Sequence, residues 1–159
     1  MPLALTDDGI LLEGIHDATV AELGETFGRF NRCGQRMDLF ARFENYVAAI
    51  RRTEWACTLI VDGSFVMWRV DDPEDVDVVL GYPPEVADLV EADMLRPYQL
   101  NVLEPSHCKR TYKIDLKACT VDGPAFRERV EFYAQVSMKR ADKHGLPAGS
   151  RKGLVRVIL

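Results

Sequence analysis

The chain has 159 residues, of which 47% are hydrophobic and 28% are charged, and its formal net charge is −5 at pH 7. This length fits a single domain over residues 1–159, and the composition excludes a disordered chain because enough apolar side chains are present to fill a core. Since no apolar run approaches the roughly 20 residues of a membrane span and the first residues lack a signal-peptide pattern, we expect a cytoplasmic protein with no membrane contact.

Hydrophobic periodicity and turn residues divide the chain into short helices and strands. Apolar residues at helical spacing predict the helices, and short β-rich runs bounded by glycine or proline predict the strands. In chain order, we expect a lead-in with a short helix over residues 1–34, a helix over 35–52, strands over 56–62 and 76–80, a helix over 85–95, a loop or weak strand over 96–108, a strand over 111–120, a helix over 122–143 and a strand over 154–159. This alternation predicts an α+β or α/β sandwich in which helices flank a mixed β-sheet.

Two of the expected helices carry specific sequence signals. The short N-terminal helix should begin at Asp17 or Thr19, because both are good helix caps and acidic residues follow them. In the helix over 35–52, an apolar stripe that includes Met37 should face the core. Arg36 and most of the other charged residues of that helix should lie on the opposite side.

The end of the strand over 56–62 is the first of two motifs that suggest chemistry, because Gly63 and Ser64 follow it. Gly63 has no Cβ, so the backbone there can approach a ligand closely. The Ser64 hydroxyl and the neighbouring amides can bind phosphate, most effectively where a helix begins. Taken alone, the two residues are equally consistent with an ordinary turn at the end of a strand.

Asp75 and Asp77, at the start of the strand over 76–80, form the second motif. Residues two apart in a strand point to the same face, so both carboxylates should project together while Val76 points into the core. A divalent cation such as Mg²⁺ or Mn²⁺ would relieve their repulsion, since these ions prefer hard oxygen ligands. The cysteines and histidines show no zinc spacing, so a metal site would have to be built from carboxylates. The alternative is a solvated acidic turn.

Together, the motifs resemble the signature of the DNA polymerase beta-like nucleotidyltransferases, in which Gly-Ser ends a strand and Asp-x-Asp begins the next after ten intervening residues. The resemblance implies a third carboxylate on a later strand. Asp115 is the best match, and Asp122, in a turn, is the alternative. The resemblance further implies a metal-dependent transfer of a nucleoside monophosphate from a nucleoside triphosphate, with Asp75, Asp77 and Asp115 as metal ligands and catalytic groups.

The same resemblance implies a phosphate-binding set that includes cations. The suggested groups are Gly63, Ser64, Arg69 and Lys113, with Lys109 and Lys152 as further candidates. Arg69 is the only basic residue between the two motifs, so other cations would have to come from later in the chain. Lys113 could instead form an ion pair with Asp115, as could Lys117.

Three stretches make the chain similar to a group of short bacterial nucleotidyltransferase-like proteins. They are residues 13–19, 62–66 and 152–156. By analogy with small nucleotidyltransferases, this similarity implies a toxin–antitoxin or defence pair with a protein partner encoded nearby. The alternative is a catalytically degenerate interaction protein, an antitoxin or a partner subunit on the same fold.

Charge is distributed unevenly along the chain. Residues 1–104 contain 20 acidic and 8 basic residues, whereas residues 105–159 contain 5 acidic and 12 basic residues. This asymmetry is consistent with an acidic metal site that faces a basic phosphate-binding surface, or with two solvated faces of opposite sign that could pair with a partner. Nucleic-acid binding through the basic third is not favoured, because the whole chain is acidic and lacks an array of basic and aromatic residues.

Overall fold

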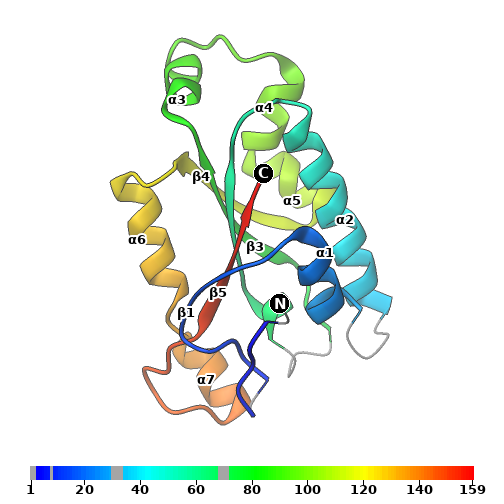
Figure 1. Cartoon of the computed structure of the whole chain (residues 1–159), viewed down its shortest axis with the longest axis vertical. Helices are drawn as coiled ribbons and strands as arrows, with labels where there is room; N and C mark the ends of the chain where they lie inside the picture. The colour runs from blue at the N-terminus through cyan, green and yellow to red at the C-terminus, as the bar shows by residue number, and fades with distance from the viewer. Residues whose placement is uncertain (1–2, 8, 30–33, 68–71) are drawn as a thin grey trace.

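Five strands form a mixed sheet in the spatial order β1-β5-β2-β3-β4 (Figure 1). The computed structural model describes residues 3–7, 9–29, 34–67 and 72–159. The strands are β1 (Gly14–Asp17), β2 (Thr58–Asp62), β3 (Val76–Tyr82), β4 (Ile114–Thr120) and β5 (Gly153–Ile158). β2 is antiparallel to both of its neighbours, β3 and β5, while β1 pairs with β5 and β4 pairs with β3 in parallel.

Helices flank this sheet, which confirms the expected α+β fold with a mixed sheet. In chain order they are α1 (Val20–Leu23), the π-helical turn η1 (Gly24–Gly28), α2 (Gly34–Arg51), the 3₁₀ turn η3 (Ser64–Val66), α3 (Pro84–Glu91), α4 (Pro97–Leu103), α5 (Pro105–Tyr112), α6 (Pro124–Tyr133) and α7 (Met138–His144). Among these helices, none is both long and apolar enough to cross a membrane.

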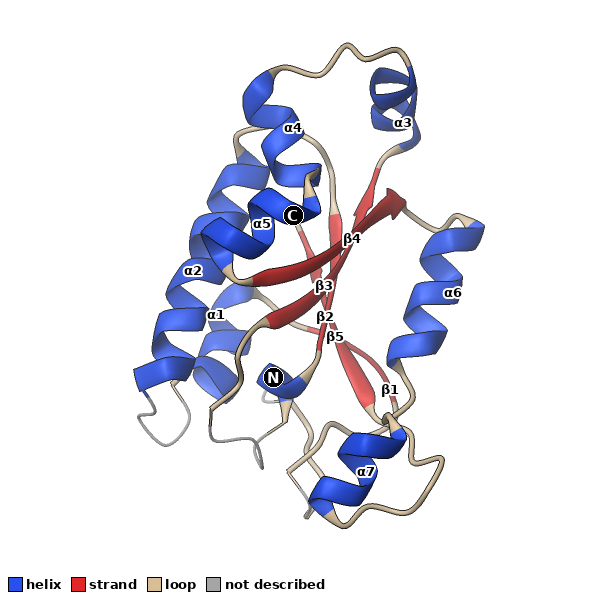
Figure 2. Cartoon of the chain, turned by 180° about the vertical axis from the view of Figure 1, so that it is seen from behind, coloured by secondary structure: helices blue, strands red, loops and turns tan. Residues whose placement is uncertain are grey.

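The two faces of the sheet are covered unequally (Figure 1 and Figure 2). α1, α2, α4 and α5 lie on one face, and α6 lies on the other. Along β3, Val76, Val78 and Leu80 belong to the large core on the α2 side, whereas Val79 belongs to a smaller cluster with α6. Because side chains alternate along a strand, Asp77 lies on the α6 face.

The segment over residues 96–108 is helical, which corrects the expectation of a loop or weak strand. α4 and α5 each begin with a proline in the first helical turn, Pro97 and Pro105. Proline suits this position because its fixed φ fits the helix and its missing N–H would have no partner within the helix. Each helix is short and fully buries one side chain, Val102 or Cys108, so little helical periodicity is visible in the sequence.

The single helix expected over residues 122–143 is divided into α6 and α7. Between them, Gln135 pairs with Arg151 in an antiparallel bridge, and the Val136 amide donates to the Ser150 carbonyl at 2.9 Å. The Val136 amide is therefore bonded to a neighbouring segment and not to a carbonyl of a helix. The chain turns at this point, and α7 lies at the lower end of the molecule in Figure 1.

At the N-terminus, Thr19 is the residue that caps α1. Its side chain accepts a hydrogen bond from the Glu22 amide, while the Glu22 carboxylate accepts one from the Thr19 amide at 2.8 Å. This reciprocal pair is a capping box. Asp17, the other candidate, lies in β1 and forms an ion pair with Arg156.

α2 confirms the helix expected over 35–52, but its buried side differs from the predicted stripe. Arg36 is fully buried, while Met37 is 49% exposed. The Arg36 guanidinium donates hydrogen bonds to the carbonyls of Phe65 and Met67, both at 2.6 Å, and to that of Phe27 at 3.3 Å. A buried charged group is tolerated when it is hydrogen-bonded. These bonds connect α2 to the chain that follows β2.

We predict that Arg36→Met lowers the free energy of unfolding by about 3 kcal/mol, because the carbonyls of Phe65 and Met67 would lose their donors inside the core. Urea denaturation measures this change. Arg36→Lys should restore only part of the loss, since one ammonium cannot reproduce the fork of a guanidinium. Arg51→Met, at an exposed position on the same helix, is the matched control and should cost less than about 1 kcal/mol. An Arg36→Met protein as stable as this control would contradict the prediction.

Candidate functional site

Three aspartates lie next to one another at one end of the sheet. In the strand register, Asp62 of β2 is opposite Asp77 of β3, and Asp77 is opposite Asp115 of β4. Side chains of directly paired residues project to the same face, and neighbouring strands are about 5 Å apart, so the three carboxylates form one acidic row on the α6 face. Asp77 and Asp115 are among the site residues predicted from the sequence, whereas Asp62 is not.

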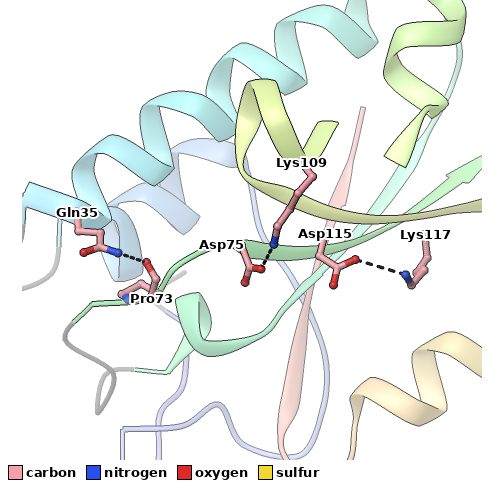
Figure 3. Close-up of polar contacts among 6 residues, drawn as sticks. All are labelled: Gln35, Pro73, Asp75, Lys109, Asp115 and Lys117. Atoms are coloured by element: carbon pink, nitrogen blue, oxygen red, sulfur yellow. Dashed lines mark hydrogen bonds and ion pairs between the residues drawn. The ribbon is translucent and has the colours of Figure 1, made fainter. Parts of the chain in front are cut away.

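Asp75 lies just before β3 and forms an ion pair with Lys109 of α5 (Figure 3). The hydrogen bond that Lys109 donates to Asp75 raises the pKa of the Lys109 ammonium; burial opposes this shift, and the charges of Asp75, Asp115 and Asp77 add to it. The charges of all three carboxylates proposed from the sequence therefore stabilise the protonated form of this one lysine. Lys109 was only a further candidate in the sequence, because helix α5 was not expected there.

Asp115 is partly exposed and pairs with Lys117 at 3.4 Å (Figure 3). Of the two lysines that the sequence suggests as ion-pair partners of Asp115, Lys117 is therefore the one that pairs with it. Lys113, expected on the same strand face, instead caps α5 with a left-handed backbone (φ 53°) before β4 begins. Asp122 follows the far end of β4, so Asp115 is the carboxylate that lies beside Asp77.

The bend after β2 lies against Asp77. Gly63 has φ 85° and ψ −167°, a conformation that is essentially restricted to glycine, and a Cβ added there would overlap the Asp77 carboxylate. Ser64 begins the single 3₁₀ turn η3 and not a longer helix. The Gly-Ser motif and the acidic row are thus in direct contact. Arg69, the other proposed phosphate ligand, lies outside the described residues.

A cavity of about 560 Å³ opens beside Asp77, between the end of the sheet and the connection from α6 to α7. Asp62, Asp77 and Lys152 line it from the sheet, and Phe132 and Tyr133 line it from α6. Burial raises the pKa of the Tyr133 phenol to about 12, with smaller contributions from the charges of nearby aspartates, including Asp77. Tyr133 therefore remains protonated at neutral pH and lies within the electrostatic field of the acidic row.

Lys152 and Asp62 form an ion pair at the floor of this cavity, and both side chains are only 4% exposed. Burial lowers the pKa of the Lys152 ammonium to about 7. An acidic residue in an apolar strand, directly before Gly63, was the sequence signal that could have identified Asp62. Removing two charges from water is costly, so the pair is hard to explain by packing alone.

Comparison with known proteins places the chain in a family. Residues 3–158 match a family described as "Family of unknown function (DUF6932)". The chain belongs to DUF6932. Neither the curated proteins nor the solved structures include a significant match to it. The description of DUF6932 assigns no chemistry, so the chemistry has to be inferred from the side chains themselves.

The carboxylates of this DUF6932 chain have the donor chemistry for a divalent cation. Mg²⁺ and Mn²⁺ prefer carboxylate oxygens, and the Lys109 ammonium marks a point on which Asp75, Asp77 and Asp115 all act. In the part of the chain that the structure describes, no group of three Asp, Glu, His or Cys side chains is arranged to hold a metal ion. A cation bound to Asp75 would have to compete with its ion pair to Lys109.

We predict that Gly63→Ala lowers the free energy of unfolding by about 2 kcal/mol more than Gly145→Ala does. Both glycines have a positive φ, but a Cβ at Gly145 would meet no atom within 4 Å, so the control measures backbone strain alone. The difference reports the overlap with Asp77 together with the additional backbone strain of the Gly63 conformation. Urea denaturation of the two variants is the measurement, and equal losses would argue against the close contact between Gly63 and Asp77.

We also predict that Lys152→Met costs about 3 kcal/mol of unfolding free energy, because it leaves the Asp62 carboxylate buried without its partner. The double variant Asp62→Asn/Lys152→Met removes both charges and should recover most of that loss. A thermodynamic cycle that includes Asp62→Asn measures the coupling between the two groups. Purely additive effects would show that the ion pair contributes nothing to folding.

Proposed function

We propose that this DUF6932 protein is a Mg²⁺-dependent nucleotidyltransferase that transfers a nucleoside monophosphate from a nucleoside triphosphate to a hydroxyl of a protein, an RNA or a small molecule. The observation that supports it best is the strand register that aligns Asp77 with Asp115 beside the Gly63 bend. A glycine bend would let phosphates approach the backbone, and neighbouring carboxylates would supply oxygen ligands at the same place.

The residues divide into distinct roles in this proposal. Asp75, Asp77 and Asp115 would hold Mg²⁺ or Mn²⁺, which when bound supplies positive charge for the phosphates and for the attacking oxygen. Asp115 is 44% exposed, so its carboxylate is accessible to accept the proton of the acceptor hydroxyl. The Ser64 hydroxyl, next to Gly63, could donate a hydrogen bond to a phosphate oxygen.

Lysines would provide the positive charge that the segment between the two motifs lacks. Lys109 reaches Asp75 from α5, and Lys152 reaches Asp62 from the start of β5. Phosphate oxygens of a bound triphosphate would compete with these carboxylates for the ammonium groups, because they offer the same kind of charged acceptor. Both lysines come from the basic part of the sequence, as a phosphate-binding surface would require.

We predict that at least one nucleoside triphosphate binds in the presence of Mg²⁺, and that Asp77→Asn weakens this binding at least about tenfold, because the substitution removes a charged oxygen ligand. Isothermal titration calorimetry with each of the four triphosphates measures the affinity. Asp88→Asn, on the exposed side of α3, is the matched control and should bind as the wild type does. Transfer of label from α-labelled triphosphates to cell-extract protein or RNA should disappear in Asp77→Asn as well.

A second candidate function is a catalytically degenerate interaction protein, such as an antitoxin or a partner subunit. The observation that favours it is that lysines already neutralise three acids of the site. The pairs are Lys109 with Asp75, Lys117 with Asp115 and Lys152 with Asp62. In that case the wild type would bind no triphosphate, and a stoichiometric complex with the product of a neighbouring gene would persist in Asp77→Asn. Such a result would replace the first proposal.

A further inference from the structure

The helix side of the cavity beside Asp77 is an apolar wall made of Phe132, Tyr133 and Met138. Phe132 is 65% exposed and Met138 is 75% exposed, although both side chains are large and apolar. The Phe132 and Tyr133 rings lie 5.6 Å apart at an interplanar angle of 69°, so they contact edge to face. Exposed apolar side chains that line a concave surface commonly mark a binding site.

The sheet side of the same cavity is charged. Asp77 and the ion pair between Lys152 and Asp62 form this side, and the pair is almost completely buried. Within the described residues, Lys152 Nζ and Asp62 Oδ1 contact each other in the ion pair, and neither atom has a further hydrogen-bond partner. A lysine ammonium has three donors, so Lys152 retains hydrogen-bonding capacity at the floor of the cavity.

A ligand that fits both sides must join a flat apolar part to an anionic part. Nucleotides have this construction, and the cavity, at about 560 Å³, lies within the size range of small-molecule sites, roughly 300–1,000 Å³. The two parts lie in one cavity, because Asp77, Phe132 and Tyr133 all line it. A ligand seated on that wall would place its other end at the carboxylates.

We propose that the cavity binds the base of a nucleotide, stacked on the exposed ring of Phe132, with the phosphates directed toward Asp77 and Lys152. This inference rests on the proposed nucleotidyltransferase function and adds the site that recognises the base. Stacking on a phenyl ring is tolerant of base identity, since every base has an aromatic face. The Tyr133 hydroxyl, which stays protonated, would be a donor to the sugar or to the base.

Calorimetry with two probes, ATP and inorganic tripolyphosphate, each with Mg²⁺, separates the base from the phosphates. Phe132→Ala should weaken ATP binding about tenfold and leave tripolyphosphate binding unchanged. Phe132→Trp, which keeps a stacking surface, should bind ATP at least as well as the wild type. Tyr98→Ala removes a partly exposed ring on α4 and serves as the control. Because Phe132 is mostly exposed, circular dichroism should show an unchanged fold.

The outcomes distinguish this inference from the function on which it rests. If Phe132→Ala binds ATP as the wild type does while Asp77→Asn loses both probes, the base lies elsewhere and the nucleotidyltransferase proposal stands. If Phe132→Ala weakens both probes equally, the ring supports the phosphate site and not the base, and the inference is wrong. If the wild type binds neither tripolyphosphate nor any of the four nucleoside triphosphates, both proposals are overturned.

Discussion

The pairing of β2 with β3 is the constraint from which the rest of the site follows. Val76, Val78 and Leu80 are fully buried on the α2 side, and a shift of one residue would move all three to the α6 side. Hydrophobic packing on one face thereby sets the register, and the register places Asp77 opposite Asp62 on the other face. Packing of the apolar side chains on the α2 side therefore places these carboxylates next to each other, although their like charges repel.

The bend after β2 is likewise held in position by contacts with other parts of the chain. Arg36 crosses the core from α2 and binds the carbonyls of Phe65 and Met67, immediately after the Gly-Ser turn. On the strand side of the bend, Gly63 lies so close to the Asp77 carboxylate that no side chain fits between them. The turn is therefore fixed on both sides, which is the kind of pre-organisation that a phosphate site requires. It also explains why a charged residue is buried in the first turn of α2.

The uneven distribution of charge along the sequence is partly compensated in space by ion pairs. Acids from the first part of the chain pair with bases from the last third. These pairs are Asp62 with Lys152, Asp75 with Lys109, Glu13 with Arg151, and Asp17 with Arg156. The two parts of opposite sign thus contact each other within one molecule. Most of the pairs are exposed and add little stability, whereas the buried pair at the cavity has its two charges shielded from water.

The position of Asp115 beside Asp77 depends on the pairing of β3 with β4, and in the sequence it was implied only by the family resemblance. By itself, the sequence determined four of the five strands and the long helix, because these are local properties of spacing and turn residues, but it did not indicate β1, which lies in the expected lead-in. It did not show that residues 96–108 are helical, since two short helices that each bury one side chain carry little periodicity. Only the tertiary structure decided that Asp62 joins the acidic row and that Lys109 contacts Asp75. Both contacts join elements that are distant in the chain, and strand order and helix packing, which no local pattern encodes, bring those elements together.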